Sequence, residues 1–143
     1  AMSYAIRQEK VTNVLDIATL TGAVWQALGY TVAGSMSDDD AFYGVFQQAL
    51  ANSGEQYLRF PFGKEHEKML ESAVADLKNI GGDCCGIITA GLFIRYFAEN
   101  LPWIHLDIAG TAWIDTPLYA YDSKGATGAG VTSLYYMLKE AGE

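Results

Sequence analysis

The feature of this sequence that most constrains its fold is the alternation of short apolar runs with longer segments whose apolar residues recur at helical spacing. The runs 11–20 and 103–108 are predicted strands, because they are short and apolar, and the second alternates strictly. Segments 37–53, 87–100 and 131–138 place apolar residues on one side of a helix. This order predicts the α/β class, with a mixed, mostly parallel sheet flanked by helices.

Weaker signals fill the segments between these elements. Ser37 is the predicted N-cap of a helix whose first turn holds Asp38, Asp39 and Asp40, and Ser53-Gly54 ends that helix. The remaining predictions are a helix tail at 1–9, a turn at 21–23, a strand within 27–36, an extended segment at 57–62, an exposed charged helix at 64–72, a short strand at 74–80 and a turn-rich stretch at 109–130.

Composition narrows the classes of partner. The chain has 143 residues, half of them apolar, which suits one domain with a real core. Its formal net charge is −8, so phosphate backbones and anionic lipid surfaces are unfavourable partners, and we expect neither nucleic acid nor membrane binding. No apolar run approaches the roughly 20 residues that cross a bilayer, and no signal-peptide pattern opens the sequence. Two adjacent cysteines favour a reducing, cytoplasmic setting.

Acidic residues in or beside the predicted strands are the first candidates for chemistry. Asp16, Asp76 and Asp107 all have such positions, and His105 shares a strand face with Asp107. Asp16, His105 and Asp107 together would suit a metal or acid–base cluster. The alternative is that each carboxylate is hydrogen-bonded to nearby backbone or hydroxyl groups in a buried position.

Other candidates carry weaker signals. The glycine-rich stretch 125–130 precedes a helix and could bind an anion through its N–H groups, or could allow tight packing there. Cys84 and Cys85 lack C-x-x-C spacing and are expected to be small buried thiols, whereas His66 is expected to be a solvated surface residue. No G-x-S-x-G motif supports a nucleophile, which leaves Ser35, Ser37 and Thr19 without an identified base.

Six blocks of sequence resemble the leucyl (cytosol) aminopeptidase family, in family order and spacing. They are DIATLTGA with ALG (16–29), SGE before an extended R-F-P segment (53–61), ADLKNIGG (75–82), ITAGLF (88–93), WIHLDIAGTAW (103–113) and KGATGAGV (124–131). The resemblance covers nearly the whole chain. It identifies residues 1–143 as the C-terminal portion of a leucyl aminopeptidase catalytic domain.

The resemblance implies a cytosolic, hexameric metallopeptidase that removes N-terminal residues, often leucine, from peptides. Two divalent ions (zinc, manganese or magnesium) would activate a water for attack on the scissile carbonyl. In the family, a lysine and several carboxylates bind these ions, two of them in an Asn-Thr-Asp-Ala-Glu-Gly-Arg stretch that also supplies a catalytic arginine. A second catalytic lysine lies earlier still. None of these residues matches a position here, so we expect no catalytic residue, no metal ligand and no bound metal in this chain.

The resemblance places the chain's own contribution in the substrate pocket. Family positions that contact the substrate backbone and first side chain, or line the pocket for that side chain, correspond to Thr19, Leu20, Gly22, Ile80, Ala109 and Ala112. Small residues at these positions would leave room for leucine or methionine. We therefore expect peptides as partners of the parent enzyme and no peptidase activity from this chain alone.

Two alternatives remain open at this point. The chain could be a non-catalytic assembly or binding module derived from the family. Some family members bind DNA, although the charge of −8 and the lack of a basic cluster argue against that here. An independent metalloenzyme could be built on Asp16, His105 and Asp107. Whichever holds, a sheet that lacks the upstream half of its domain would expose an apolar face, so we expect self-association.

Overall fold

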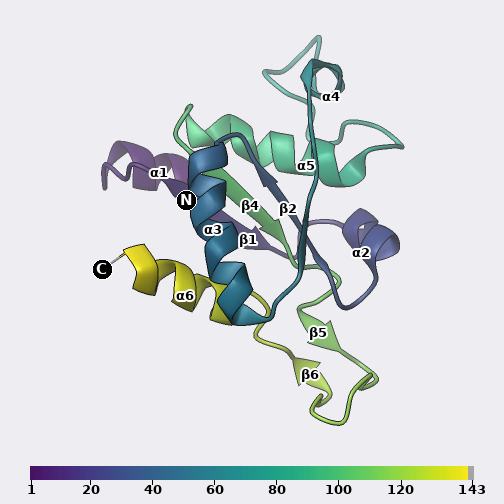
Figure 1. The fold of residues 1–143 in the computed structure, drawn as a ribbon. Helices are drawn as coiled ribbons and strands as arrows, with labels where there is room; N and C mark the ends of the chain where they lie inside the picture. Colours follow the sequence, from purple (N-terminus) through teal and green to yellow (C-terminus); the bar gives the residue numbers. More distant parts are fainter. Residues whose placement is uncertain (142–143) are drawn as a thin grey trace.

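The computed structural model describes residues 1–141, which form a four-stranded sheet with helices on both faces (Figure 1). The strands are β1 (Val14–Ala18), β2 (Ala33–Ser37), β3 (Tyr57–Arg59) and β4 (Trp103–Asp107), in the spatial order β1-β4-β2-β3. β4 runs parallel to β1 and antiparallel to β2, and β2 runs parallel to β3. The predicted class, a mixed and mostly parallel α/β sheet, is therefore confirmed.

Six α-helices surround this sheet within the described residues. α3 (Asp40–Ser53) and α6 (Val131–Ala141) pack together on one face. The other face carries α1 (Met2–Arg7), α2 (Gly22–Leu28) and α5 (Gly86–Arg95), which continues as a short 3-10 helix, η1 (Tyr96–Ala98). α4 (Lys64–Lys68) is a short outer helix, and β5 (Trp113–Ile114) pairs with β6 (Gly125–Ala126) in a hairpin that projects from the sheet (Figure 1). No helix among the described residues is long and apolar enough to cross a membrane.

The strict alternation of residues 103–107 divides the core into two parts. Ile104 and Leu106 are buried on the α3/α6 face, where they pack with Phe46 and neighbouring apolar residues. Trp103 points to the opposite face and joins Met36 and other side chains beneath α5. Side chains two apart in a strand point the same way, so His105 and Asp107 also face the α2/α5 layer. β4 is thus the strand that connects the core to the candidate site.

Two helix starts differ from the prediction. Asp39, not Ser37, is the N-cap of α3, and its Oδ1 accepts a hydrogen bond from Phe42 N at 2.7 Å. Ser37 is the last residue of β2, where its hydroxyl donates to Trp103 O at 2.7 Å. The predicted turn at 21–23 is the first turn of α2, because the Thr21 hydroxyl accepts from Val24 N and caps the helix.

The predicted strand at 74–80 is wrong, because this segment is irregular. Val74 is 96% exposed and Ile80 is 76% exposed, so its apolar residues do not form a buried face. Only Leu77 packs against the core. The predictions for 27–36, 57–62, 87–100 and 131–138 each coincide with an observed element, whereas the helix expected at 64–72 shortens to Lys64–Lys68.

Candidate functional site

The candidate site lies where β1 and β4 end. These strands are parallel and in register, with Ala18 beside Asp107, so the loops that follow them leave the same edge of the sheet. The Ile108 N–H donates to Ala18 O at 2.9 Å and extends the pairing by one step. Loop ends at the carboxyl edge of parallel strands are common binding positions in α/β proteins. The shared edge therefore brings segments 19–22 and 108–112 together.

The Asp107 carboxylate holds the two loops in place. Its Oδ1 accepts from Leu20 N at 3.1 Å, Thr21 N at 3.4 Å and Ala109 N at 3.2 Å. Its Oδ2 accepts from the Thr21 hydroxyl at 2.7 Å. The residue is only 1% exposed, so these donors replace the water that a buried carboxylate requires. Asp107 thus fits the alternative that the sequence left open, a buried carboxylate satisfied by nearby groups.

Gly110 allows the second loop to lie against α2. A Cβ at this position would overlap the carbonyl oxygen of Gly29, the residue that ends α2. The Ala112 N–H donates to Ile108 O at 2.9 Å, which closes a tight turn around Gly110. No larger residue fits at Gly110 without displacing the backbone of one of the two segments.

Five of the six predicted substrate residues gather at this edge. They are Thr19, Leu20 and Gly22 from the first loop and Ala109 and Ala112 from the second, and the first three are exposed. Ile80 comes from a third segment, which leads into α5.

That third segment is connected to the edge through α5. A Cβ at Gly81 would lie 2.7 Å from Thr89 Cβ, so the segment passes directly along the helix. A Cβ at Gly86, the first residue of α5, would lie 3.1 Å from Ala23 Cβ, next to Gly22. Ile80 exposes its side chain to solvent beside this junction.

The proposed cluster of Asp16, His105 and Asp107 does not form. Asp16 pairs with His105 Nδ1 at 2.5 Å and accepts from Trp103 Nε1 at 2.8 Å, while Asp107 is engaged by the loops. The His105 ring stacks on Trp103, and its Nε2 is buried without a hydrogen-bond partner. Asp76 is exposed in the irregular segment. Among residues 1–141, no three His, Cys, Asp or Glu side chains converge as a metal site would require.

Glu55 is a structural residue that sequence reasoning missed. Its carboxylate accepts from Gly130 N at 2.7 Å and from Ser133 N at 3.0 Å, so the anion at the start of α6 is the protein's own side chain. Burial first, and then the charge of Glu55, raises the pKa of Tyr57 to about 12. Glu55 and Gly130 are 75 residues apart in sequence, so no local sequence pattern predicts this contact.

Two further expectations are wrong. Cys84 and Cys85 are both exposed and free, not buried. His66 is largely covered, with 20% of its side chain exposed, because Gly63 N donates to its Nδ1 at 3.1 Å. All three residues lie in irregular or short helical segments, where sequence periodicity says little about burial.

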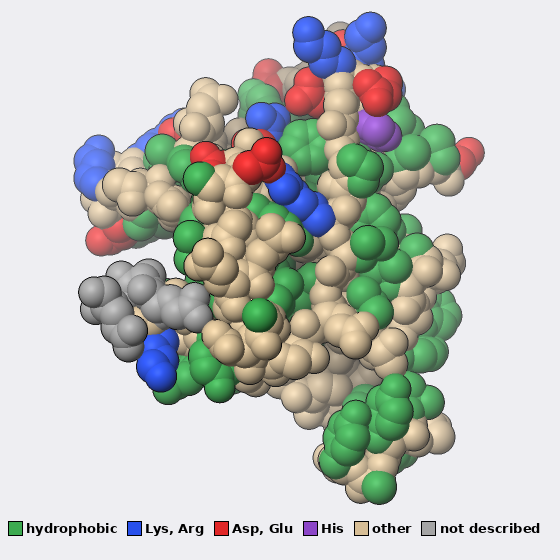
Figure 2. Space-filling model, in the orientation of Figure 1, with side chains coloured by type: hydrophobic (Ala, Val, Ile, Leu, Met, Phe, Trp, Pro, Cys, Tyr) green, Lys and Arg blue, Asp and Glu red, His purple; other side chains and the backbone are tan. Residues whose placement is uncertain are grey.

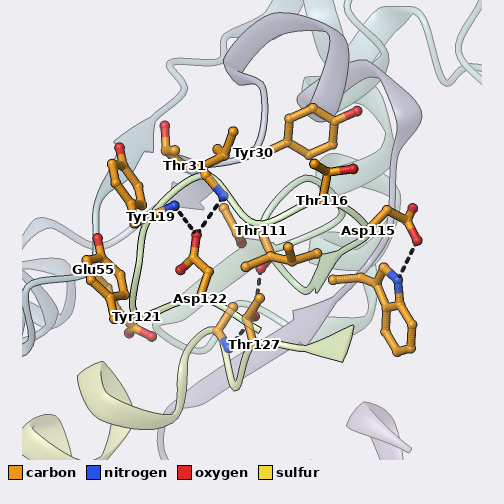
Figure 3. Close-up of a pocket in the computed structure, with 14 residues that line it drawn as sticks. Tyr30, Thr31, Glu55, Thr111, Asp115, Thr116, Tyr119, Tyr121, Asp122 and Thr127 are labelled. Atoms are coloured by element: carbon orange, nitrogen blue, oxygen red, sulfur yellow. Dashed lines mark hydrogen bonds between the residues drawn. The ribbon is translucent and has the colours of Figure 1, made fainter. Parts of the chain in front are cut away.

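A cavity of about 560 Å³ adjoins the second loop through Thr111 (Figure 3). Its walls include the aromatic side chains of Tyr30, Trp113, Tyr119 and Tyr121. The Asp122 carboxylate accepts from the main-chain N–H groups of Leu118 and Tyr119, at 3.1 and 3.0 Å, which closes the loop between β5 and β6. Figure 3 marks hydrogen bonds of Asp122 with dashed lines. The turn-rich pattern of residues 109–130 does not predict this cavity.

Comparison with known proteins places these features in a family. The pattern of the cytosol aminopeptidase family, catalytic domain, matches residues 1–135. The "Probable cytosol aminopeptidase" of Treponema denticola is 48% identical over 144 aligned positions, which cover 99% of this chain and 30% of that protein. The protein of the same name from Clostridium perfringens is 46% identical over 135 residues, covering 94% of this chain and 27% of that protein.

Solved structures agree with the sequence relatives. The bottromycin maturation enzyme BotP in complex with Mn superposes with a TM-score of 0.91 at 34% identity, over 99% of this chain and 32% of BotP. A mutant of tomato leucine aminopeptidase gives a TM-score of 0.88 at 36% identity, over 98% of this chain and 27% of that protein. This chain therefore spans less than a third of the length of these relatives. On this evidence the chain belongs to the cytosol aminopeptidase family and matches the catalytic domain of that family over residues 1–135.

Proposed function

We propose that this chain forms one wall of the first-residue pocket of a metal-dependent aminopeptidase that releases leucine-like N-terminal residues from peptides. The observation that carries the proposal is the pair of loops after β1 and β4, which Asp107 holds together. Family membership and the name of the tomato relative, a leucine aminopeptidase, support the activity and the type of substrate.

The chemistry of the two loops suits a peptide with an apolar first residue. Gly22, Ala109 and Ala112 are small and leave space above the sheet edge. Leu20 is 36% exposed and offers an apolar contact beside main-chain groups that can bind a peptide backbone. No Lys or Arg lies in either loop, so an acidic first side chain would lack a partner.

The residues present do not fit a dinuclear metal centre. Asp16 and Asp107, the carboxylates nearest in sequence to the site, are already paired within the fold. The Mn in the BotP complex is a property of that protein, and it supports divalent metal use by a complete enzyme of this family. We propose that such an enzyme binds its two metal ions outside this segment, is cytoplasmic and assembles as a hexamer, and that this chain alone is inactive.

Binding and hydrolysis can be tested separately on the 143-residue chain. Titration with the dipeptide Leu-Gly, followed by amide chemical shifts, should perturb Thr19, Leu20 and Ala109 more than Glu-Gly does. Ala112→Leu should weaken that response because it fills the pocket, whereas the matched variant Ala41→Leu, at an exposed position of α3, should not. Equal responses to the two dipeptides would contradict the pocket and favour an assembly module.

Activity is measured with leucine p-nitroanilide in the presence of Mn²⁺. We expect no release of nitroaniline above the rate of the buffer. Hydrolysis that depends on the chain and on the metal would overturn the expected inactivity. The dipeptide titration would still test the pocket separately.

A further inference from the structure

Cys84 and Cys85 form an exposed vicinal pair just before α5. Both thiols are free and exposed, and Cys85 is the residue that precedes the first turn of the helix. Cys85 has a positive φ of 56°, which a non-glycine residue adopts only when neighbouring structure requires it. The pair is therefore displayed to solvent in one defined backbone conformation.

The two thiols belong to consecutive residues and interact. A side-chain hydrogen bond with Cys84, and to a smaller extent burial, raises the pKa of Cys85. Cys85 therefore keeps its proton to a higher pH than an unperturbed cysteine does. The adjacent pair favours a reagent that binds two neighbouring thiols over one that needs a lone thiolate.

A direct disulfide between these residues is disfavoured. The peptide bond that joins them is trans, and consecutive Cα atoms across a trans bond are about 3.8 Å apart. Disulfides normally require Cα atoms about 4.4–6.8 Å apart. A bridging atom with longer bonds to sulfur relieves this mismatch, because the sulfurs can then remain apart.

We propose that Cys84 and Cys85 are a binding site for trivalent arsenic carrying one organic substituent. The arsenic(III) oxide group condenses with both thiols: two S–As bonds form, both As–O bonds break, and the two thiol protons leave with the oxygen as water. No oxidation state changes, so the step needs no oxidant or reductant. The product is an S–As–S bridge, which the main chain between the two residues closes into a ring.

The donor set selects this ligand over zinc. Structural zinc takes four ligands, and among residues 1–141 no three His, Cys, Asp or Glu side chains converge. An arsenic atom that already carries one carbon substituent needs only the two thiols. The ring would close within the segment that joins Ile80 to α5, but the inference rests on the two cysteines and is independent of the proposed function.

The test uses phenylarsine oxide and the reduced 143-residue chain. Intact mass should show one phenylarsenic group per chain, and both thiols should lose their reaction with a colorimetric thiol reagent. A small dithiol should reverse the adduct, while an equal amount of a monothiol should not. Absence of the adduct would overturn the proposal.

Single variants test the chelate. Because the second S–As bond is intramolecular, Cys84→Ser and Cys85→Ser should each weaken binding by about 100-fold or more. A matched control, Cys84→Ser combined with Ala73→Cys, keeps two exposed thiols but separates them, and it should bind as weakly as the single variants. Wild-type affinity in the single variants or in this control would show that adjacency is irrelevant and would overturn the proposal.

Discussion

At the scale of single residues, Asp107 joins the fold to the candidate site. It belongs to β4, and its carboxylate accepts hydrogen bonds from donors in both loops that hold the predicted substrate residues. A buried carboxylate with four donors is stable only while those donors stay in place. The loops and the strand therefore depend on each other.

We expect Asp107→Ala to lower the free energy of unfolding by about 3 kcal/mol. The substitution removes charge-assisted hydrogen bonds and leaves partly buried N–H donors without an acceptor. Urea unfolding followed by circular dichroism measures the loss. The same substitution at Asp76, which is exposed in an irregular segment, should change stability by less than about 0.5 kcal/mol. Equal effects at the two positions would contradict the role of Asp107.

Tyr57 predicts a specific loss of stability in alkali. Its pKa is about 12 in the folded chain, against 10.0 for an unperturbed tyrosine. The folded state thus holds this proton more tightly than the unfolded state, so the contribution is present below pH 10 and is lost as pH rises toward 12. When urea unfolding is measured across this pH range, the free energy of unfolding of Tyr57→Phe should fall less steeply than that of the wild type. The exposed-site control Tyr135→Phe should keep the wild-type decline.

Family motifs predict which residues contact the substrate, but they do not indicate what holds those residues in place. The motif identifies Thr19 and Ala109 by position alone. It does not show that Asp107 accepts from Leu20 N, because this contact joins residues 87 apart and depends on the register of β1 with β4. The sequence suggested Asp16, His105 and Asp107 as one possible cluster. In the structure Asp16 pairs with His105, and Trp103 Nε1 donates to the other oxygen of Asp16, a contact between residues 87 apart.

At the scale of secondary-structure elements, α5 lies unusually close to the sheet. Gly91 is buried in this helix, and a Cβ there would overlap Met36 Sδ of β2 and lie 3.5 Å from His105 Cδ2 of β4. The glycine carries an intrinsic cost in a helix interior of about 1 kcal/mol relative to alanine. The close approach of α5 to β2 and β4 explains why the position tolerates that cost.

Gly91→Ala should therefore destabilise the chain by about 1–3 kcal/mol despite the better helix propensity of alanine. Gly44 in α3 provides the matched control, since a Cβ there meets nothing within 4 Å. Gly44→Ala should stabilise by about 0.5–1 kcal/mol. Thermal unfolding of both variants measures whether each substitution raises or lowers stability. A higher stability of Gly91→Ala would mean that α5 can move away from the sheet without cost.

Elements were predictable where burial imposes a period and unpredictable where it does not. β4 alternates because Ile104 and Leu106 face the apolar layer of α3 and α6, whereas His105 and Asp107 point to the other face and have polar partners there. α3 shows helical spacing because it packs on β4. Segment 74–80 contains Val74 and Ile80, which read as a strand, but both are exposed. α2 was missed because its seven residues are too few to show a period, although Thr21 supplied a capping signal.

At the scale of the whole molecule, two regions with exposed apolar side chains are candidates for association. β1 is an edge strand within the described sheet, and Ile17 in it is 39% exposed. The hairpin end forms the second place, where Leu118, Tyr119 and Tyr121 are exposed and Figure 2 shows apolar side chains at the lower right. An open strand edge presents unpaired N–H and C=O groups that another chain can pair with. The edge at β1 is thus the stronger determinant of association.

We expect the chain to self-associate through β1, with a molar mass by light scattering above that of a monomer and rising with concentration. Ile17→Lys places a charge on the open edge and should shift the population toward monomer, because a lysine there must lose its water when a second strand pairs. Leu138→Lys is the matched control, since Leu138 is 73% exposed on α6. If the hairpin end drives association instead, both lysine variants will retain the molar mass of the wild type. A wild-type chain that stays monomeric at high concentration would contradict the prediction altogether.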